Sequence, residues 1–336
     1  MAYTTIDDPS SVFQCTLYSG TGSQQSITNG GNSDLQPDWL WIKERDGTSS
    51  HQLMDAVRLY YNRIESNNDS AQLDAGQTGA TNQNVTSFDS DGFGVKNGAA
   101  VNESGKAYVA WQWKKQAGVF DIQTWTGNGS NRTISHNLGV IPQMMIVKKR
   151  NPAGGNWQVN TAQLAANQLV ELDENTTAAQ DNSYFNNTRP TSSVIHIGTD
   201  GNQNTNTHTY LTYLFGNKQG VCKVGSYLGN GESSNGTFVY TGFRPAWIMR
   251  KNVDGSVTEH WIIQDNKRNT FNVVDKWLEA STAVVDDTAY QTDFLSNGFK
   301  MRSNNDGTNR SNVKYIYLAF AEKPFVTSTG VPTTAR

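Results

Sequence analysis

The residues that could perform acid–base chemistry lie mostly in patterns that turn the backbone. Five aspartates stand beside or close to glycines: Asp89, Asp91, Asp200, Asp254 and Asp306. Aspartate favours turns, and glycine adopts positive φ without steric cost. A glycosidase instead needs two carboxylates at a defined separation, and no carboxylate pair sets one part of the chain apart. We therefore predict no catalytic residue.

One acidic segment has the beginning of a calcium-binding sequence. Asp89-Ser90-Asp91-Gly92 resembles a fragment of a calcium loop, in which alternate carboxylates and a distal glutamate supply oxygen ligands. The third carboxylate and the distal glutamate are missing. Asp89 and Asp91 are thus calcium candidates, and the alternative is a simple turn.

Nucleophiles and metal ligands also lack the spacing of a site. No Gly-x-Ser-x-Gly sequence places a serine on a strand-to-helix turn. The histidines lack the four-residue spacing of a helical zinc pair; they are His51, His136, His196, His208 and His260. His51 and His260 follow apolar strands at comparable distances, which indicates a repeated structural position. The sequence predicts a non-enzymatic protein without a metal or other cofactor.

Landmarks recur three times in the same order. An aromatic-x-Gly-x-Gly pattern begins at Tyr18, Trp125 and Tyr227, after steps of 107 and 102 residues. Apolar segments led by proline begin at Pro37, Pro142 and Pro245, and strands of alternating apolar residues begin at Tyr108, Tyr210 and Tyr315. Turns at Asp91-Gly92, Asp200-Gly201 and Asn297-Gly298 precede the last strands. A repeat of this kind predicts three copies of one unit.

The predicted organisation is an arm (1–12), three modules (13–117, 118–219 and 220–325) and a tail (326–336). We expect each module to be a mainly β, antiparallel sandwich with about one short helix. Alternate apolar residues in the last strand indicate packing on one side, whereas the proline-led segments are apolar on both faces and predict central strands. Helical patterns occur at 163–172 and 271–279, and 56–64 is ambiguous between helix and strand. The glycine patterns predict tight turns after each first strand.

Two further predictions concern the cysteines and the basic residues. Cys15 and Cys222 fall on equivalent strands of different modules, and a disulfide would require two cores to share it, so we expect buried free thiols. The basic pairs and triplets end apolar strands, where we expect them to solvate strand ends. They are Lys148-Lys149-Arg150 and Arg250-Lys251.

Composition narrows the classes of partner. The net charge of −3 and the absence of long basic runs predict no nucleic-acid partner. No apolar stretch approaches the roughly twenty residues of a membrane span. The polar, acidic first residues predict that there is no signal peptide, and hence synthesis in the cytoplasm of the producing cell.

Several segments resemble a family of marine bacteriophage virion proteins, often described as tail-fibre-like or structural, from phages of cyanobacteria and other marine bacteria. The segments are 1–10, 37–45, 87–93 and 321–330. The resemblance implies a concanavalin-like, jelly-roll sandwich and a place on the virion surface, and it supplies no catalytic residue. The second and third modules lack the Ser-Phe-Asp-Ser-Asp-Gly-Phe sequence of 87–93.

The leading functional prediction is a tail-fibre-like or receptor-binding protein whose partners are other virion proteins and a host-surface glycan. Tyr60 and Tyr317 are candidates for exposed glycan platforms; the alternative is that such aromatics belong to cores. A capsid decoration protein is the second hypothesis and a glycan-degrading enzyme the third. The oligomeric state stays open between a homotrimer and a pseudo-threefold surface made by one chain.

Overall fold

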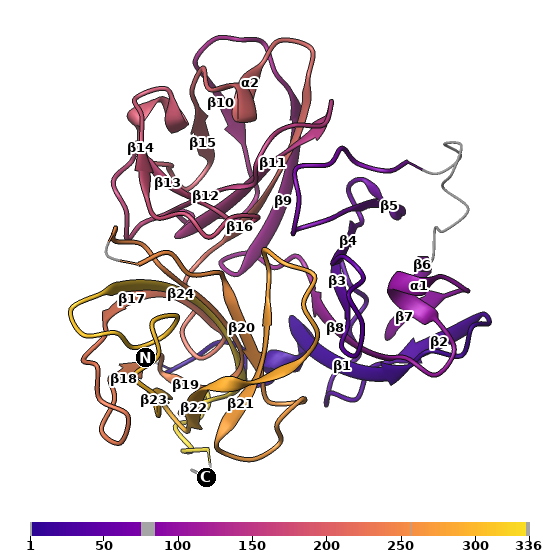
Figure 1. Cartoon of the computed structure of the whole chain (residues 1–336), viewed down its shortest axis with the longest axis vertical. Helices are drawn as coiled ribbons and strands as arrows, with labels where there is room; N and C mark the ends of the chain where they lie inside the picture. The colour runs from indigo at the N-terminus through magenta and orange to yellow at the C-terminus, as the bar shows by residue number, and fades with distance from the viewer. Residues whose placement is uncertain (1, 75–84, 256, 334–336) are drawn as a thin grey trace.

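A computed structural model describes residues 2–74, 85–255 and 257–333. The chain is mainly β, with 44% of residues in strands and 5% in helices. The three predicted modules each contribute one main antiparallel sheet, and Figure 1 shows the sheets grouped around a common centre. The second module lies at the top, the third at the lower left and the first at the right of that view.

The main sheets share one strand order. In each of them the last strand of the module lies between the module's first strand and its proline-led strand and pairs with both. In module 1 the order is β1 (Phe13–Ser19), β8 (Ala107–Trp113), β3 (Trp39–Glu44), β4 (Gln52–Asp55) and β5 (Leu59–Ile64). In module 2 it is β9 (Phe120–Thr126), β16 (Thr209–Phe215), β11 (Met144–Asn151), β12 (Gln158–Thr161), β13 (Gln168–Glu171) and β14 (Ala179–Gln180). In module 3 it is β17 (Cys222–Leu228), β24 (Lys314–Pro324), β19 (Phe243–Asn252), β20 (Ile262–Asp265) and β21 (Val274–Glu279).

A smaller set of strands covers the outer face of each main sheet. The sets are β2 (Gln25–Thr28), β7 (Gly92–Val95) and β6 (Val85–Asp89) in module 1, and β10 (Arg132–Ser135) with β15 (Val194–Ile197) in module 2. In module 3, β22 (Asp287–Leu295), β23 (Gly298–Met301) and β18 (Phe238–Tyr240) continue the main sheet into one eight-stranded, nearly closed sheet.

One apolar core is shared by all three modules. The inner faces of the main sheets meet there, and aromatic rings touch across module boundaries. Trp39 stacks on Tyr213 with ring centroids 4.2 Å apart, and Phe13 stacks on Phe320 at 5.0 Å. Three further clusters fill the space between each main sheet and its outer strands. The proline-led strands are therefore central and covered on both faces, as predicted. The prediction that the last strands pack on one side was wrong, because they are buried on both faces between the shared core and the outer clusters.

The helix predictions for 163–172 and 271–279 were wrong: the first segment contains a turn and β13, and the second leads into β21. Residues 56–64, which the sequence left ambiguous, form a turn and the strand β5. Short apolar runs do not by themselves distinguish a strand from a helix. The described helices are instead η1 (Pro9–Ser11), α1 (Ala99–Asn102), η2 (Tyr184–Asn187) and α2 (Gly201–Asn204). None of them has the length and apolar character to cross a membrane.

One of the predicted repeated turns has a different role. Asp91-Gly92 and Asn297-Gly298 close hairpins between outer strands, as expected. Asp200 instead caps α2, because its Oδ1 accepts from Asn202 N at 2.9 Å. The Asp200-Gly201 pair therefore starts a helix and is not the equivalent of the other two turns.

The basic residues at the strand ends are buried, so the prediction that they solvate those ends was wrong. Lys43, Lys148 and Lys251 occupy the same position in the three proline-led strands, and all are fully buried. Their ammonium groups donate to backbone carbonyls; Lys148 Nζ, for example, reaches Gly155 O at 2.7 Å and Asn68 O of module 1 at 3.3 Å. Burial lowers the pKa of Lys43 and Lys148 to about 8 and that of Lys251 to about 7.

Both cysteines are buried free thiols, as predicted, although the reason given for this was incomplete. Cys15 and Cys222 line the same shared core, so separate cores are not what keeps them apart. Desolvation raises the pKa of Cys15 well above its usual value and that of Cys222 to about 12, which keeps both groups in the thiol form.

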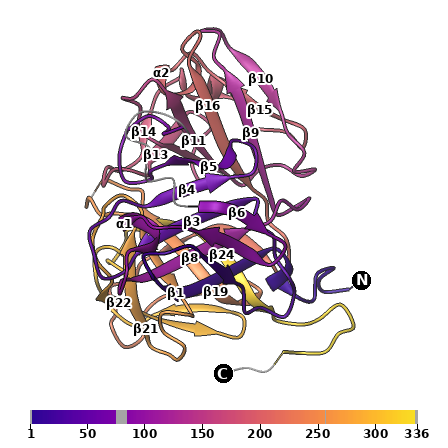
Figure 2. The same cartoon turned by 90° about the vertical axis from the view of Figure 1, so that its right-hand side faces the viewer.

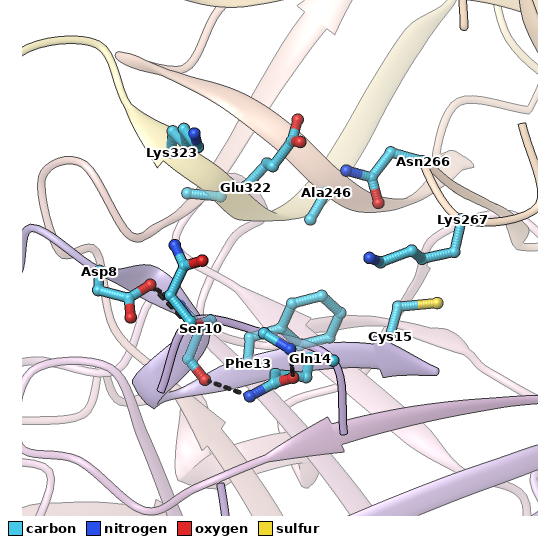
Figure 3. A pocket seen from close by; sticks show the side chains of 14 residues that line it. Asp8, Ser10, Phe13, Gln14, Cys15, Ala246, Asn266, Lys267, Glu322 and Lys323 are labelled. Carbon is cyan, nitrogen blue, oxygen red and sulfur yellow. Dashed lines mark hydrogen bonds between the residues drawn. The ribbon is translucent and has the colours of Figure 1, made fainter. Parts of the chain in front are cut away.

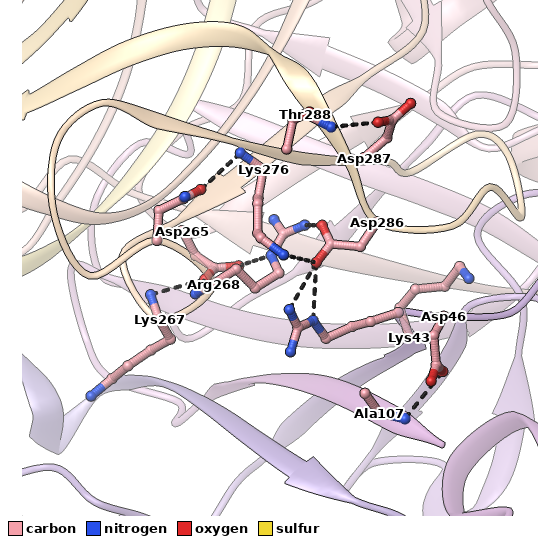
Figure 4. A network of polar contacts seen from close by, with 12 residues as sticks. Lys43, Asp46, Ala107, Asp265, Lys267, Arg268, Lys276, Asp286, Asp287 and Thr288 are labelled. Atoms are coloured by element: carbon pink, nitrogen blue, oxygen red, sulfur yellow. Dashed lines mark hydrogen bonds and ion pairs between the residues drawn. The ribbon is translucent and has the colours of Figure 1, made fainter. Parts of the chain in front are cut away.

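Equivalent contacts join the modules in a ring, and the contact between modules 3 and 1 is ionic (Figure 4). Arg268 Nε lies 2.6 Å from Asp265 Oδ2, and its Nη1 lies 3.0 Å from Asp286 Oδ1. Module 1 completes the network, because Trp111 Nε1 donates to Asp265 at 3.1 Å and Arg45 Nη2 donates to Asp286 at 2.9 Å. The Arg268 and Asp265 side chains have no exposed area.

The contact between modules 1 and 2 repeats this geometry with fewer charges. Arg58 Nε pairs with Asp55 Oδ2 at 2.6 Å, and Tyr213 of module 2 donates its hydroxyl to the same carboxylate at 2.9 Å. Gln72 takes the place of Asp286 and accepts from both Arg58 and Arg150. The backbone bond is kept: Gln72 N donates to Arg150 O at 2.8 Å, as Asp286 N donates to Arg45 O at 2.6 Å.

The third contact, between modules 2 and 3, has neutral residues at the same positions. Thr161 and Leu164 replace the Asp–Arg pair, and Leu318 replaces Trp111 and Tyr213. Ala178 N still donates to Val253 O at 3.2 Å. An ion pair is present where the neighbouring module supplies a hydrogen-bond donor and absent where it supplies leucine. A buried charge without a partner costs several kcal/mol. An Asp–Arg pair is therefore compatible with a neighbouring module that supplies a donor and not with one that supplies leucine.

At one further position, a side chain of each module forms a hydrogen bond to the neighbouring module. This position corrects the prediction that His51 and His260 are equivalent. Trp157 Nε1 donates to Glu65 O at 2.9 Å, Trp261 Nε1 donates to Glu171 O at 2.8 Å, and His51 Nε2 lies 3.1 Å from Thr282 O. His51 is thus equivalent to Trp157 and Trp261, and His260 lies one position earlier. Burial lowers the pKa of His51 to about 3, so the ring is neutral and Nδ1 accepts from Trp41.

The N-terminal arm and the C-terminal segment both lie against module 3 (Figure 2). Tyr3 donates its hydroxyl to Gly242 O of module 3 at 2.8 Å, and Thr4 Oγ1 donates to the carbonyl oxygen of Gln219, the last residue of module 2, at 2.9 Å. Asp7 accepts from the backbone of Ser328 at 2.6 Å. The arm therefore contributes side chains to the surface of the third module.

Candidate functional site

The two calcium candidates lie at the β6–β7 hairpin. Asp89 ends β6, and Asp91 Oδ1 accepts from Leu35 N at 3.2 Å, which ties the hairpin to a neighbouring loop. Across 2–74, 85–255 and 257–333, no group of three or more His, Cys, Asp or Glu residues is placed to hold a metal ion. The observed role of Asp91 is to hold the turn.

The two tyrosines predicted as glycan platforms have different surroundings. Tyr60 is half-buried, edge-to-face with Tyr61 at 5.1 Å and tilted against Phe88 at 6.0 Å. Tyr317 is only 2% exposed and packs edge-to-face on Phe299 at 5.2 Å. The prediction that Tyr317 is an exposed platform was therefore wrong, although its hydroxyl borders a hollow described below.

The glycine patterns are tight turns, as predicted. In each turn the backbone N–H of the second glycine donates to the carbonyl oxygen of a buried asparagine, as Gly22 N does to Asn102 O at 3.0 Å. The side-chain Oδ1 of the same asparagine accepts a hydrogen bond from the backbone N–H of the residue between the two glycines. A Cβ on Gly20 would overlap the Glu103 carbonyl oxygen, and Gly22 has φ of 70°. Both positions therefore require glycine for structural reasons.

Module 3 departs from the repeat at a groove lined by residues of β17 and β18, two strands that Figure 1 labels at its left and lower left. Two adjoining hollows of about 430 and 270 Å³ share Asn217, Lys223 and Tyr240 in their walls. We call them together the β17–β18 groove. Its lining also includes Tyr3, Gln163, Gly225, Ser226, Tyr227, Phe238 and Tyr317.

Two cross-strand partners form the floor of the β17–β18 groove. Gly225 faces Tyr317 across the β17–β24 ladder, where module 1 pairs Thr16 with Ala110 and module 2 pairs Gln123 with Thr212. A Cβ at position 225 would lie 2.6 Å from Tyr317 Oη. Glycine therefore makes room for a tyrosine that only this module has.

Two exposed aromatic residues form the wall of the groove on β18. Phe238 is 45% and Tyr240 is 48% exposed, and Val239 between them is buried in the core. Equivalent positions carry Ser26 and Thr28 in module 1, and Thr133 and Ser135 in module 2. Module 3 thus replaces small polar side chains with a pair of rings on one face of the strand.

The groove is polar, and two lysines lie in its lining: Lys223 borders both hollows, and Lys218 borders the smaller one. Lys223 Nζ donates to Tyr240 O at 2.8 Å and lies 5.3 Å from the centre of the Tyr240 ring, and burial lowers its pKa. Tyr3 Oη lies 3.1 Å from Tyr240 Oη; desolvation, with that hydrogen bond, raises the pKa of Tyr3 to about 12. No carboxylate lines either hollow.

Tyr317 is the buried tyrosine without a hydrogen bond. The other five buried tyrosines each donate their hydroxyl to a backbone carbonyl or a carboxylate, at 2.5–2.9 Å. Tyr317 Oη makes no such bond within the described part of the chain, and it borders the groove. Burial raises the pKa of Tyr317, so the hydroxyl stays protonated and can donate to a bound molecule.

A family model described as a domain of unknown function (DUF7483) matches residues 8–324. The chain belongs to this family. The DUF7483 match extends over all three main sheets and ends with the last residue of β24. No curated protein and no solved structure matches the DUF7483 chain.

The groove was not predicted from the sequence, because the residues considered as module-specific were carboxylates and nucleophiles, and the groove is built from aromatic residues and a glycine. The signal was present in the repeat register of the DUF7483 chain, where Gly225, Phe238, Tyr240 and Tyr317 all differ in character from their equivalents. Comparing the modules for aromatic and glycine substitutions would have found it.

A second cavity, of about 170 Å³, lies between modules 1 and 3 of the DUF7483 chain (Figure 3). Many of its polar groups bond to one another: Asp8 Oδ1 accepts from Ser10 Oγ at 2.7 Å, and Gln14 Nε2 donates to Ser10 O at 3.0 Å. The Cys15 thiol that lines it has a raised pKa, which makes it a poor nucleophile. We therefore interpret this cavity as part of the packed contact between modules 1 and 3 and not as a functional site.

Proposed function

We propose that this DUF7483 protein is a non-enzymatic structural protein of a bacteriophage virion, tail-fibre-like or receptor-binding, displayed on the particle surface. The observation that carries the proposal is the β17–β18 groove, a module-specific departure on a scaffold that otherwise repeats. A binding role needs such a recess with exposed aromatics and a few polar groups. The resemblance of the chain's ends and first module to phage virion proteins supports the same proposal.

The chemistry of the groove supports a binding role over a hydrolytic one. Glycoside hydrolysis in most families uses two carboxyl groups on either side of the bond to be cleaved, and neither hollow has a carboxylate in its lining. In the larger hollow the lysine, Lys223, is already held by the Tyr240 carbonyl and ring, and the groups that remain are rings, hydroxyls and amides. Lys218 borders the smaller hollow.

The proposal extends to the fold class and the assembly. We infer that each module is a concanavalin-like sandwich, since a main sheet packs over outer strands across its own apolar cluster. The three modules in one chain form a pseudo-threefold ring, which would present a threefold-like surface to other virion proteins without a homotrimer.

A capsid decoration protein is the second candidate. One observation favours it: the helices in 2–74, 85–255 and 257–333 are at most four residues long, so these residues contain no coiled-coil shaft of the kind that extends many fibres. The ring of modules would suit a compact ornament on a shell.

Immunogold labelling of intact particles tests the proposal and separates its two forms. Antibody against the purified protein is expected to label the particle surface at the tail. Labelling over the whole capsid would replace the receptor-binding role with decoration. Unlabelled particles from a lysate that contains the protein would overturn the virion assignment.

A further inference from the structure

We propose that the β17–β18 groove is a saccharide-binding site that takes an uncharged glycan, one made of neutral or N-acetylated sugars. This inference rests on the proposed surface role and names the class of receptor. It differs from the glycan prediction made for Tyr60 and for an exposed Tyr317, because it places the site on module 3 and gives Tyr317 a buried, hydrogen-bonding role.

The rings of Phe238 and Tyr240 supply the apolar part of such a site. They stand at alternate positions of β18, so both side chains leave the same face of the strand. The Tyr3 hydroxyl and Lys223 hold the Tyr240 ring in place from two sides. The C–H face of a sugar ring is flat and apolar enough to pack on such rings, while its hydroxyls remain in the polar groove.

Tyr317 supplies a hydrogen-bonding group that the protein itself leaves unused. The other buried tyrosines donate their hydroxyls to the protein. The Tyr317 hydroxyl is not one of the fully buried unpaired groups, so it is accessible from the groove and can donate to a molecule bound there. Gly225 keeps the space above Tyr317 Oη free of a side chain. A sugar hydroxyl or an acetamido carbonyl in the groove would complete this bond.

The charges of the groove favour an uncharged glycan over an acidic one. The larger hollow, which holds Phe238, Gly225 and Tyr317, has Lys223 as the cation in its lining, and this ammonium is already bonded to Tyr240 O. The other lysine of the groove, Lys218, borders the smaller hollow alone. Ser226 Oγ donates to Gln163 Oε1 at 3.1 Å, and Asn217 bonds the edge of β17 through Val224 N, so the rim consists of neutral amides and hydroxyls. Recognition of carboxylate or sulfate groups would instead use free arginine or lysine side chains.

The test is binding of the full-length protein to two immobilised panels, one of neutral and N-acetylated oligosaccharides and one of uronic-acid and sulfated oligosaccharides. The variant Phe238→Ser/Tyr240→Thr gives module 3 the residues of module 1, and Tyr317→Phe removes only the hydroxyl. Ile141→Ser, which changes a 52% exposed residue of module 2, is the matched control. Unchanged thermal midpoints of the variants would show that the fold is kept.

We expect wild type and Ile141→Ser to bind members of the neutral panel equally. The double variant should bind at least about tenfold more weakly, because central aromatic anchors typically contribute more than about 1 kcal/mol each. Tyr317→Phe should weaken binding about three- to tenfold. Binding confined to the acidic panel or to neither panel would overturn the inference, as would equal binding by the double variant. Because particle labelling is independent, a labelled virion without glycan binding would reject this inference alone.

Discussion

Removal of Arg268 is expected to destabilise the ring of modules more than any surface substitution. The Arg268→Leu substitution copies Leu164, its equivalent in module 2. It removes the ion pairs to Asp265 and Asp286 and the bond from Nη2 to Ile263 O at 3.0 Å. Asp265 would then be a fully buried carboxylate without a cation. Breaking such a pair typically costs about 3–5 kcal/mol.

A second substitution in the same chain separates lost charge pairing from lost packing. Asp265→Thr/Arg268→Leu copies Thr161 and Leu164 and leaves no buried charge at these two positions. The remaining penalty is about 1–3 kcal/mol, because Trp111 Nε1 loses its acceptor. The double variant should therefore be more stable than Arg268→Leu alone, although it carries one more substitution.

Equilibrium urea unfolding, followed by tryptophan fluorescence, gives the free energies of unfolding. We expect a loss of about 3–5 kcal/mol for Arg268→Leu and recovery of at least about 1 kcal/mol in the double variant. A loss below about 1 kcal/mol in the single variant, or a further loss in the double variant, would refute the charge-pairing account of this contact.

Two other predictions concern stability. Lys43, Lys148 and Lys251 have folded-state pKa values of about 7 to 8, below their usual 10.5, so the unfolded chain binds more protons between these values and stability should rise from pH 7 to 9.5. A urea midpoint that falls over this range would contradict their burial. Gly20→Ala should cost about 1–3 kcal/mol by overlap with Glu103. Gly30→Ala, which meets no atom within 4 Å, should change the thermal midpoint little, and equal effects of the two would exclude steric overlap as the cause.

The sequence predicted the order of the repeats and the local structure that each repeat imposes. The Gly-x-Gly turns and the central proline-led strands were found because the signals are local: positive φ at Gly22, or two apolar faces around Trp39. The helix predictions failed because a short strand without a clean period-two pattern, such as the partly buried β21, cannot be distinguished from a helix by periodicity.

Contacts between modules could not be predicted from one module's pattern. The burial of Lys148 depends on carbonyl oxygens such as Asn68 O, which a different module supplies. The shared core likewise exists only when Trp39 meets Tyr213 across a boundary. The Gly225–Tyr317 pair in the groove depends on cross-strand register, which becomes visible once the ladders are aligned.

Competition for adsorption tests the central claim most directly, that this is a particle-surface protein which attaches through the β17–β18 groove. Purified wild-type protein would be added to host cells before the phage, and the rate of phage adsorption would be measured. We expect wild type and Ile141→Ser to slow adsorption and Phe238→Ser/Tyr240→Thr to have little effect. Adsorption that is unchanged by wild-type protein, or slowed equally by the double variant, would contradict the account.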